Sequence, residues 1–290
     1  MSSTVDSTTT PPAAPRADSG RADEATPSLV DAPASRSSAG TGGGAGAYGD
    51  AGTDGDAGPA NSTAPHPARA ALLVLADGRF PAGGHAHSGG AEAAVAAGRI
   101  TDAATLEAYC RGRLHTAGLT AAGLAAAAAA GMDPLLVDEA ADARTPVPAL
   151  RTTARRLGRQ MMRAARAAWP SPALDALAAA RPRGAHQPVV LGVVARAAGL
   201  TPHDAAHIAA YESVGGPATA AVRLLGLDPF QATAVLAGLV PELDRVAAQA
   251  AEAAGRARTE GIGALPAASG PLADIAAERH AAWSVRLFAS

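Results

Sequence analysis

From about residue 68 onward, the apolar positions of this chain follow the spacing of α-helices. Between Thr101 and Ala130, large apolar side chains recur at intervals of three and four residues. These side chains are Leu106, Tyr109, Cys110 and Leu114. Strand-type alternation is scarce, and alanine, a strong helix former, occurs throughout. The pattern therefore predicts a helical domain.

Helix start and stop signals recur along the same part of the chain. Thr201, Pro202 and Asp204 combine an N-cap, a first-turn proline and an acid at the third helical position. Similar starts occur at Ser171–Pro172 and at Asp228, Pro229 and Gln231. Glycines typical of helix ends are Gly98, Gly131, Gly199 and Gly226. The run VVLGVV from Val189 has no partner strand in the sequence, so we expect a buried helix there and an all-α fold overall.

The segment from Pro148 to Trp169 is predicted to be an amphipathic helix. Its apolar stripe consists of Leu150, Ala154, Leu157, Met161, Ala165 and Ala168. Its arginine stripe consists of Arg151, Arg155, Arg159 and Arg163, and no acidic residue lies between Arg144 and Arg166. Such a stripe is typical of a solvated face or of a docking surface for an acidic protein. Nucleic-acid binding is disfavoured because aromatic residues are not interleaved.

The first 67 residues have a different composition, dominated by Ser, Thr, Gly, Ala, Pro and Asp. A segment with so few large apolar side chains cannot offset its ordering entropy. We therefore expect a disordered low-complexity tail over residues 1–67 and a single compact domain over residues 68–290. Gly44, Gly46 and Gly49 match a dinucleotide fingerprint, but no strand precedes them, so we do not interpret them as a cofactor site.

Composition excludes several classes of function. All 24 basic residues are arginine. Without lysine, the chain has neither a nucleotide-binding P-loop nor Schiff-base chemistry. The net charge of −2 gives no sign of a nucleic-acid or membrane partner. A single cysteine, Cys110, and an N-terminus unlike a secretory signal lead us to expect a cytoplasmic protein.

Two histidine pairs are candidate metal ligands. His203 and His207 lie one helical turn apart with Asp204 between them, which resembles the HExxH pattern and would suit a helical metal-dependent hydrolase. Asp204 equally suits the helix cap. His85 and His87 lie in a glycine-rich turn, where the two imidazoles could contact one metal ion or hydrogen-bond the turn. No set of Ser, His and Asp residues has a spacing in the sequence that predicts a catalytic triad.

The stretch from residue 72 to residue 100, LLVLADGRFPAGGHAHSGGAEAAVAAGRI, resembles the opening of the UreF family of urease accessory proteins. The matching positions are Pro81, Gly83, His87, Ser88, Gly90 and Glu92. The resemblance continues through residues 157–163, 186–200 and 211–231. It ends in PLADIAAERHAAWSVRLFAS, where the matching positions are Asp274, His280, Arg286, Leu287, Phe288 and Ser290.

This resemblance implies an all-α adaptor, usually a homodimer, that binds UreD (also called UreH) and the GTPase UreG and assists nickel insertion into apo-urease. It implies no catalytic residues and no permanently bound cofactor. Nickel would be handled by the complex, with a weak, transient contact at His85 and His87 at most. Together with the arginine stripe, the resemblance predicts a set of partner-binding residues. They are His87, Ser88, Glu92, Arg155, Arg159, Asp274, His280, Trp283, Arg286, Leu287 and Phe288.

The last ten residues, 281–290, are predicted to be mobile in the free protein and to dock on UreD. Their apolar side chains are spaced too irregularly for one helical stripe. Trp283, Arg286 and Phe288 are of residue types that dominate binding energy when they enter a partner's pocket. The alternative is that this segment folds back and completes the core of its own domain.

Overall fold

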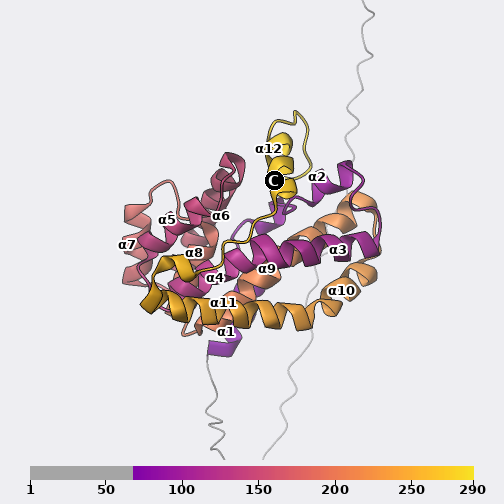
Figure 1. The fold of residues 1–290 in the computed structure, drawn as a ribbon. Coiled ribbons are helices and arrows are strands. Elements are labelled where there is room, and N and C mark those ends of the chain that lie inside the picture. Colours follow the sequence, from indigo (N-terminus) through magenta and orange to yellow (C-terminus); the bar gives the residue numbers. More distant parts are fainter. Residues whose placement is uncertain (1–67) are drawn as a thin grey trace, which may run out of the picture. The chain divides into compact units, whose positions relative to one another are not determined.

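The computed structural model describes residues 68–290, and this part of the chain contains helices and no strand (Figure 1). The α-helices are α1 (Ala68–Ala76), α2 (Ala91–Ala96), α3 (Ala103–Arg113), α4 (Leu119–Ala129), α5 (Pro134–Ala143), α6 (Pro148–Ala168), α7 (Pro172–Ala180), α8 (Gln187–Ala197), α9 (Pro202–Leu225), α10 (Pro229–Gly238), α11 (Val240–Glu260) and α12 (Pro271–Ala281). Shorter elements are η1 (Gly84–Ala86), η2 (Leu114–Gly118) and η3 (Ile262–Ala264). The all-α prediction is confirmed. The predicted tail and the Gly44–Gly49 match lie outside the described residues.

The start and stop signals in the sequence correspond to helix ends in the structure. Thr201 and Asp204 form a reciprocal capping box at the start of α9, and Asp102 forms one with Thr105 at the start of α3. All four expected stop glycines have positive φ angles. The VVLGVV run lies within α8, where every one of its residues is buried, as predicted. No helix of residues 68–290 has the length and apolar character needed to cross a membrane.

Helix α4 lies at the centre of the packing and contacts α8, α9 and α11. Its sequence, LTAAGLAAAAA, is buried on nearly every side. Because alanine carries only a methyl group, neighbouring backbones approach α4 closely. The closest approach is at Gly192 of α8, where an added Cβ atom would lie 2.2 Å from the Ala125 carbonyl oxygen and 2.6 Å from the Ala128 Cβ. Only glycine fits this crossing without displacing a backbone.

Helix α9 continues through an internal proline, Pro217. Proline has no N–H group, so the carbonyl oxygen of Ser213, four residues earlier, loses its usual helical donor. Arg113 of α3 replaces that donor, because its Nε atom donates to the Ser213 oxygen at 2.9 Å. The continuity of α9 therefore depends on a side chain from a different helix.

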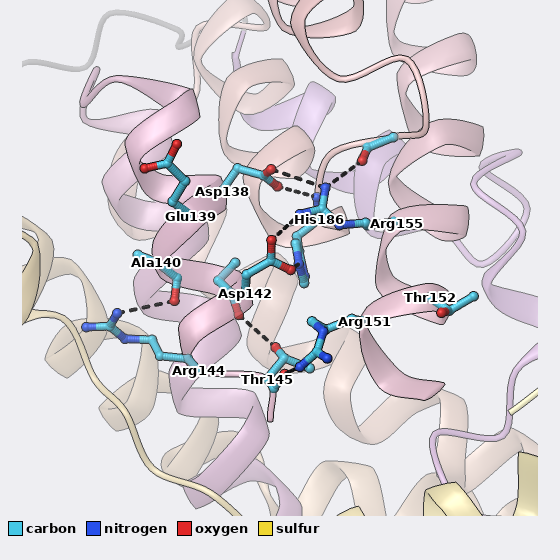
Figure 2. A network of polar contacts seen from close by, with 12 residues as sticks. Asp138, Glu139, Ala140, Asp142, Arg144, Thr145, Arg151, Thr152, Arg155 and His186 are labelled. Carbon is cyan, nitrogen blue, oxygen red and sulfur yellow. Dashed lines mark hydrogen bonds and ion pairs between the residues drawn. The ribbon is translucent and has the colours of Figure 1, made fainter. Parts of the chain in front are cut away.

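A network of charged side chains joins α5 to α6 and to the turn before α8 (Figure 2). The fully buried carboxylate of Asp138 accepts hydrogen bonds from Arg155 Nη1 at 3.2 Å, Arg181 Nε at 2.8 Å and the His186 backbone N–H at 2.7 Å. Asp142 pairs with the other arm of Arg155 and with His186 Nε2. Every polar side-chain atom buried within residues 68–290 has a hydrogen-bond partner. The network fixes how these helices are placed.

This network shows that the four arginines of the predicted stripe on α6 do not form one solvated face. Arg155 binds the acids of α5, and Arg151 donates to the Thr145 and Pro146 carbonyl oxygens. The other exposed arginines of α6 that form no ion pair within residues 68–290 are Arg156, Arg159 and Arg163. Helix periodicity alone places arginines on a face but does not show which acids of another helix lie opposite.

Substituting Gly192 with Ala is expected to lower the free energy of unfolding by about 2 kcal/mol, because the new methyl group must push α8 away from α4. Thermal or urea unfolding of the purified variant measures this loss. The matched control is Gly255→Ala on α11, where nothing lies within 4 Å of an added Cβ. In that open site alanine should stabilise the helix by about 0.5–1 kcal/mol. Equal effects at both glycines would contradict the close crossing.

Glu212 of α9 generates a prediction of pH dependence. Burial raises the pKa of its carboxyl to about 7, and the hydrogen bond from Gln187 Nε2 at 2.6 Å offsets only part of that rise. The folded state therefore binds a proton that the unfolded state has released, so the free energy of unfolding falls as pH rises from about 4.5 to about 7. Glu212→Gln should stabilise the protein more at about pH 8 than at about pH 5, by on the order of 2 kcal/mol. Urea unfolding of both proteins at the two pH values gives the comparison; a pH-independent difference would contradict the shift.

Candidate functional site

Glu92, in the first turn of α2, lies at the centre of a buried hydrogen-bond cluster. Its Oε1 atom accepts from the Leu287 backbone N–H at 2.7 Å, and its Oε2 atom accepts from the Phe288 N–H at 3.0 Å. His280 Nε2 lies 2.8 Å from the same Oε2 atom. Glu92 and His280 are both buried. One carboxylate thus holds the last helix and the segment that follows it.

The residues just before α2 hold the end of the same segment. The backbone N–H and the hydroxyl group of Ser88 both donate to the Ser290 carbonyl oxygen at 2.7 Å. His87 Nδ1 lies 2.6 Å from the Ser290 hydroxyl oxygen, and the Ala289 N–H donates to the Ala86 carbonyl oxygen at 2.8 Å. We call the contacts of residues 86–92 with His280 and residues 287–290 the C-terminal clasp. It joins positions about 200 residues apart, 202 in the case of Ser88 and Ser290.

The glycine-rich sequence around this site allows the chain to run close to its neighbours. At Gly90, φ is +87° and an added Cβ would lie 2.8 Å from the Tyr109 hydroxyl oxygen. That hydroxyl group donates to the Gly89 carbonyl oxygen at 2.9 Å. Gly83 likewise has positive φ and lies against the side chain of Gln160 on α6. These contacts position Ser88 and Glu92 so that they face the C-terminal segment.

At neutral pH, Glu92 of the clasp is ionised and His87 is neutral. Burial favours a higher pKa for Glu92, but hydrogen bonds from Leu287, His280 and Phe288 outweigh it and hold the pKa below its usual value. Ionised Glu92 therefore stabilises the fold, and this contribution is lost as pH falls through the lowered pKa. Burial, followed by the positive charges of Arg156 and His85, lowers the pKa of His87 to about 4.

Comparison with known proteins identifies the family. A family profile described as UreF matches residues 100–240. A protein from Mycobacterium sp. (strain JLS), named urease accessory protein UreF, is 46% identical over 221 residues, which cover 76% of this chain and 97% of the relative. The chain belongs to the UreF family. Relatives of the same name from Mycolicibacterium vanbaalenii and Mycobacterium tuberculosis (strain H37Ra) are each 44% identical, over 76% and 73% of this chain and 98% and 93% of their own lengths.

Membership of the UreF family confirms the resemblance seen in the sequence and identifies the protein as a urease accessory protein rather than an enzyme. The side chains proposed for the alternative hydrolase are engaged otherwise. Asp204 caps α9 through Thr201, and His207 Nε2 lies 2.8 Å from Asp244 Oδ1. The His203 ring packs edge-on against His207 with a centroid distance of 4.5 Å. In the described part of the chain, no three His, Cys, Asp or Glu side chains are grouped to hold a metal ion.

The structure brings together several of the residues that the UreF resemblance marked. The clasp contains His87, Ser88, Glu92, His280, Leu287 and Phe288. It also contains Ser290, which matched the family pattern but was not predicted to be a site residue. Asp274 lies apart from this cluster on α12, where burial raises its pKa despite the positive charge of Arg113. Arg155 and Arg159 belong to α6, outside the clasp.

The clasp contradicts the expectation that residues 281–290 are free when no partner is present. The segment folds back, and Phe288 is buried in its own domain with 6% exposure. Trp283 packs on His280 with a ring-centroid distance of 4.7 Å. Val285 and Leu287 point outward, 85% and 65% exposed. Helical spacing was the wrong test for this segment, because α12 ends at Ala281 and the residues after it form turns and bends rather than a helix.

Replacing Glu92 with Gln should release the C-terminal segment, since a neutral amide oxygen cannot replace both carboxylate oxygens as acceptors. We expect a loss of about 2–3 kcal/mol in the free energy of unfolding. Amide hydrogen exchange at Leu287 and Phe288 should become faster. Exchange in α4 should become faster only by the amount that the loss of global stability explains. The control is Glu252→Gln on the exposed face of α11. Unchanged exchange at Leu287 would disprove the role of Glu92.

Proposed function

We propose that this protein is an adaptor in urease maturation that binds UreD (UreH) and the GTPase UreG and assists nickel insertion into apo-urease. The observation that carries the proposal is the 46% identity to a urease accessory protein UreF over 97% of that protein's length. In this proposal the protein is a cytoplasmic homodimer with neither nucleic-acid nor membrane partners. Nickel is the cargo of the complex rather than a resident cofactor. With the His87 ring bonded to Ser290, the exposed His85 is left for a transient nickel contact.

The surface around the clasp suits UreD. Five large apolar side chains of α12 and the segment after it are exposed. They are Leu272, Ile275, Trp283, Val285 and Leu287. Exposed apolar groups gathered on one segment are typical of a protein interface. Because Glu92 fixes the backbone from which Leu287 projects, binding there costs less ordering entropy than docking of a free tail would.

The exposed arginines of α6 suit a second, acidic partner surface. Arg156, Arg159 and Arg163 form no ion pair within residues 68–290, so their guanidinium groups are free to bind carboxylates. Arg155 contributes indirectly, because its pairs with Asp138 and Asp142 hold α6 in place. Electrostatic attraction of this kind speeds association and orients the partner.

Leu287→Asp should weaken the complex with UreD at least tenfold while leaving the clasp intact. The substitution changes an exposed side chain, whereas Glu92 binds the backbone N–H of that residue. A desolvated aspartate in an apolar interface costs more than the roughly 1.4 kcal/mol that corresponds to a tenfold loss. Titration of UreD by the full chain measures affinity, and thermal unfolding checks that the midpoint is unchanged.

The matched control for this experiment is Leu73→Asp on α1, where the leucine is 71% exposed and belongs neither to the clasp nor to α12 and the segment after it. It should leave UreD affinity at the wild-type level. Pull-down of both partners by the wild-type protein tests the wider proposal. If the wild-type protein captures neither UreD nor UreG, the adaptor function is refuted; if it captures UreD and Leu287→Asp binds equally well, only the assigned surface is wrong.

A further inference from the structure

The C-terminal segment forms one wall of an open hollow of about 530 Å³. Other walls come from His85 of η1 and from Arg223 in the last turn of α9. The C-terminal wall contributes Ser284, Arg286 and the apolar atoms of Leu287. Three distant parts of the sequence therefore meet at this hollow. The meeting depends on the clasp, because Leu287 and Phe288 are the residues whose backbone Glu92 holds.

The ionisable side chains that line the hollow are all basic, and the charged ones are those of Arg223 and Arg286. Two guanidinium groups and one imidazole face it, and no Asp or Glu is among its lining residues. Neither Arg223 nor Arg286 forms an ion pair or a side-chain hydrogen bond with any residue in the range 68–290. Elsewhere in the same range, Arg111, Arg155 and Arg181 are each paired with an acid. The hollow thus gathers positive charge without a counter-charge from the protein.

We propose that this hollow binds an oxyanion, held between the guanidinium groups of Arg223 and Arg286. Guanidinium groups bind phosphate and carboxylate oxygens through parallel N–H bonds. The Ser284 hydroxyl group and the His85 ring supply further donors on the same walls. Leu287, which is exposed, offers an apolar surface for the body of a ligand that carries the anionic group. Two sources can supply such an oxyanion: a free phosphate, and a carboxylate presented by an acidic side chain.

Oxyanion binding is linked to the clasp. The ligand touches residues 284–289, and those residues occupy their positions only while Glu92 and Ser88 hold the segment. A ligand that binds the closed form alone must stabilise it. Conversely, loss of the clasp must weaken the binding of the ligand, because the coupling between two sites is reciprocal. The affinity of the hollow for an anion therefore depends on whether the clasp holds the C-terminal segment in place.

Isothermal titration of the full chain with inorganic phosphate tests the site, and a parallel titration with acetate distinguishes the two sources. We expect one saturable site with a dissociation constant of about 1 mM for at least one of the anions, as befits a few charge-assisted hydrogen bonds on an open surface. Tighter binding of phosphate would assign the site to a free phosphate. Tighter binding of acetate would assign it to a carboxylate. Absence of saturable binding for both anions would overturn the proposal.

The double variant Arg223→Gln with Arg286→Gln should raise the dissociation constant at least about tenfold. The matched control is Arg256→Gln, an exposed arginine of α11 outside the hollow, which should bind as the wild type does. The bound anion should also slow amide exchange at Leu287 and Phe288 in the wild type and not in the double variant. Equal anion affinity in the double variant, or unchanged exchange on binding, would overturn the assignment even if anions bind elsewhere.

Discussion

Close contact between helix backbones around α4 is the constraint on which the rest of this structure depends. Aromatic residues make up 3% of the chain, and α4 offers its neighbours little more than methyl groups. Small side chains make enough dispersion contacts only when the helices are very near one another, because these forces fall off steeply with distance. The glycine at the α8 crossing and the alanines that face it are therefore consequences of one requirement. Such a core tolerates little added volume.

A surface of methyl groups gives a neighbouring helix few shape features against which to align. Hydrogen-bonded carboxylates supply that alignment in two places. The carboxylates of Asp138 and Asp142 fix α5, α6 and the turn before α8, and Glu92 fixes the C-terminal segment. A fully hydrogen-bonded polar network in a low-dielectric setting is costly to disrupt. A polar group that loses its partner there has neither a hydrogen bond to the protein nor one to water. The small side chains allow dense packing, and the charged ones select a single arrangement.

Signals that act within a few residues could be predicted from the sequence. Caps such as Ser171 and Thr201, the terminating glycines and the buried VVLGVV helix were all predicted correctly, because each depends on hydrogen bonds or burial that the local sequence specifies. The positions of Arg155 and Phe288 could not be derived in this way. Their partners, the carboxylates of Asp138 and Glu92, are brought close only by the fold. Family resemblance marked most clasp residues without showing that they bind one another.

The proline in α9 has a consequence for how the chain folds. Taken alone, residues 202–225 would form a helix interrupted at Ser213, since no backbone N–H of that segment can donate to its carbonyl oxygen. The donor comes from Arg113, which lies 100 residues earlier in the chain. During synthesis α3 is made first, so this donor is already present when Pro217 emerges. Formation of the full α9 and its docking on α3 are thus one event, and the two helices form and open as a single cooperative unit.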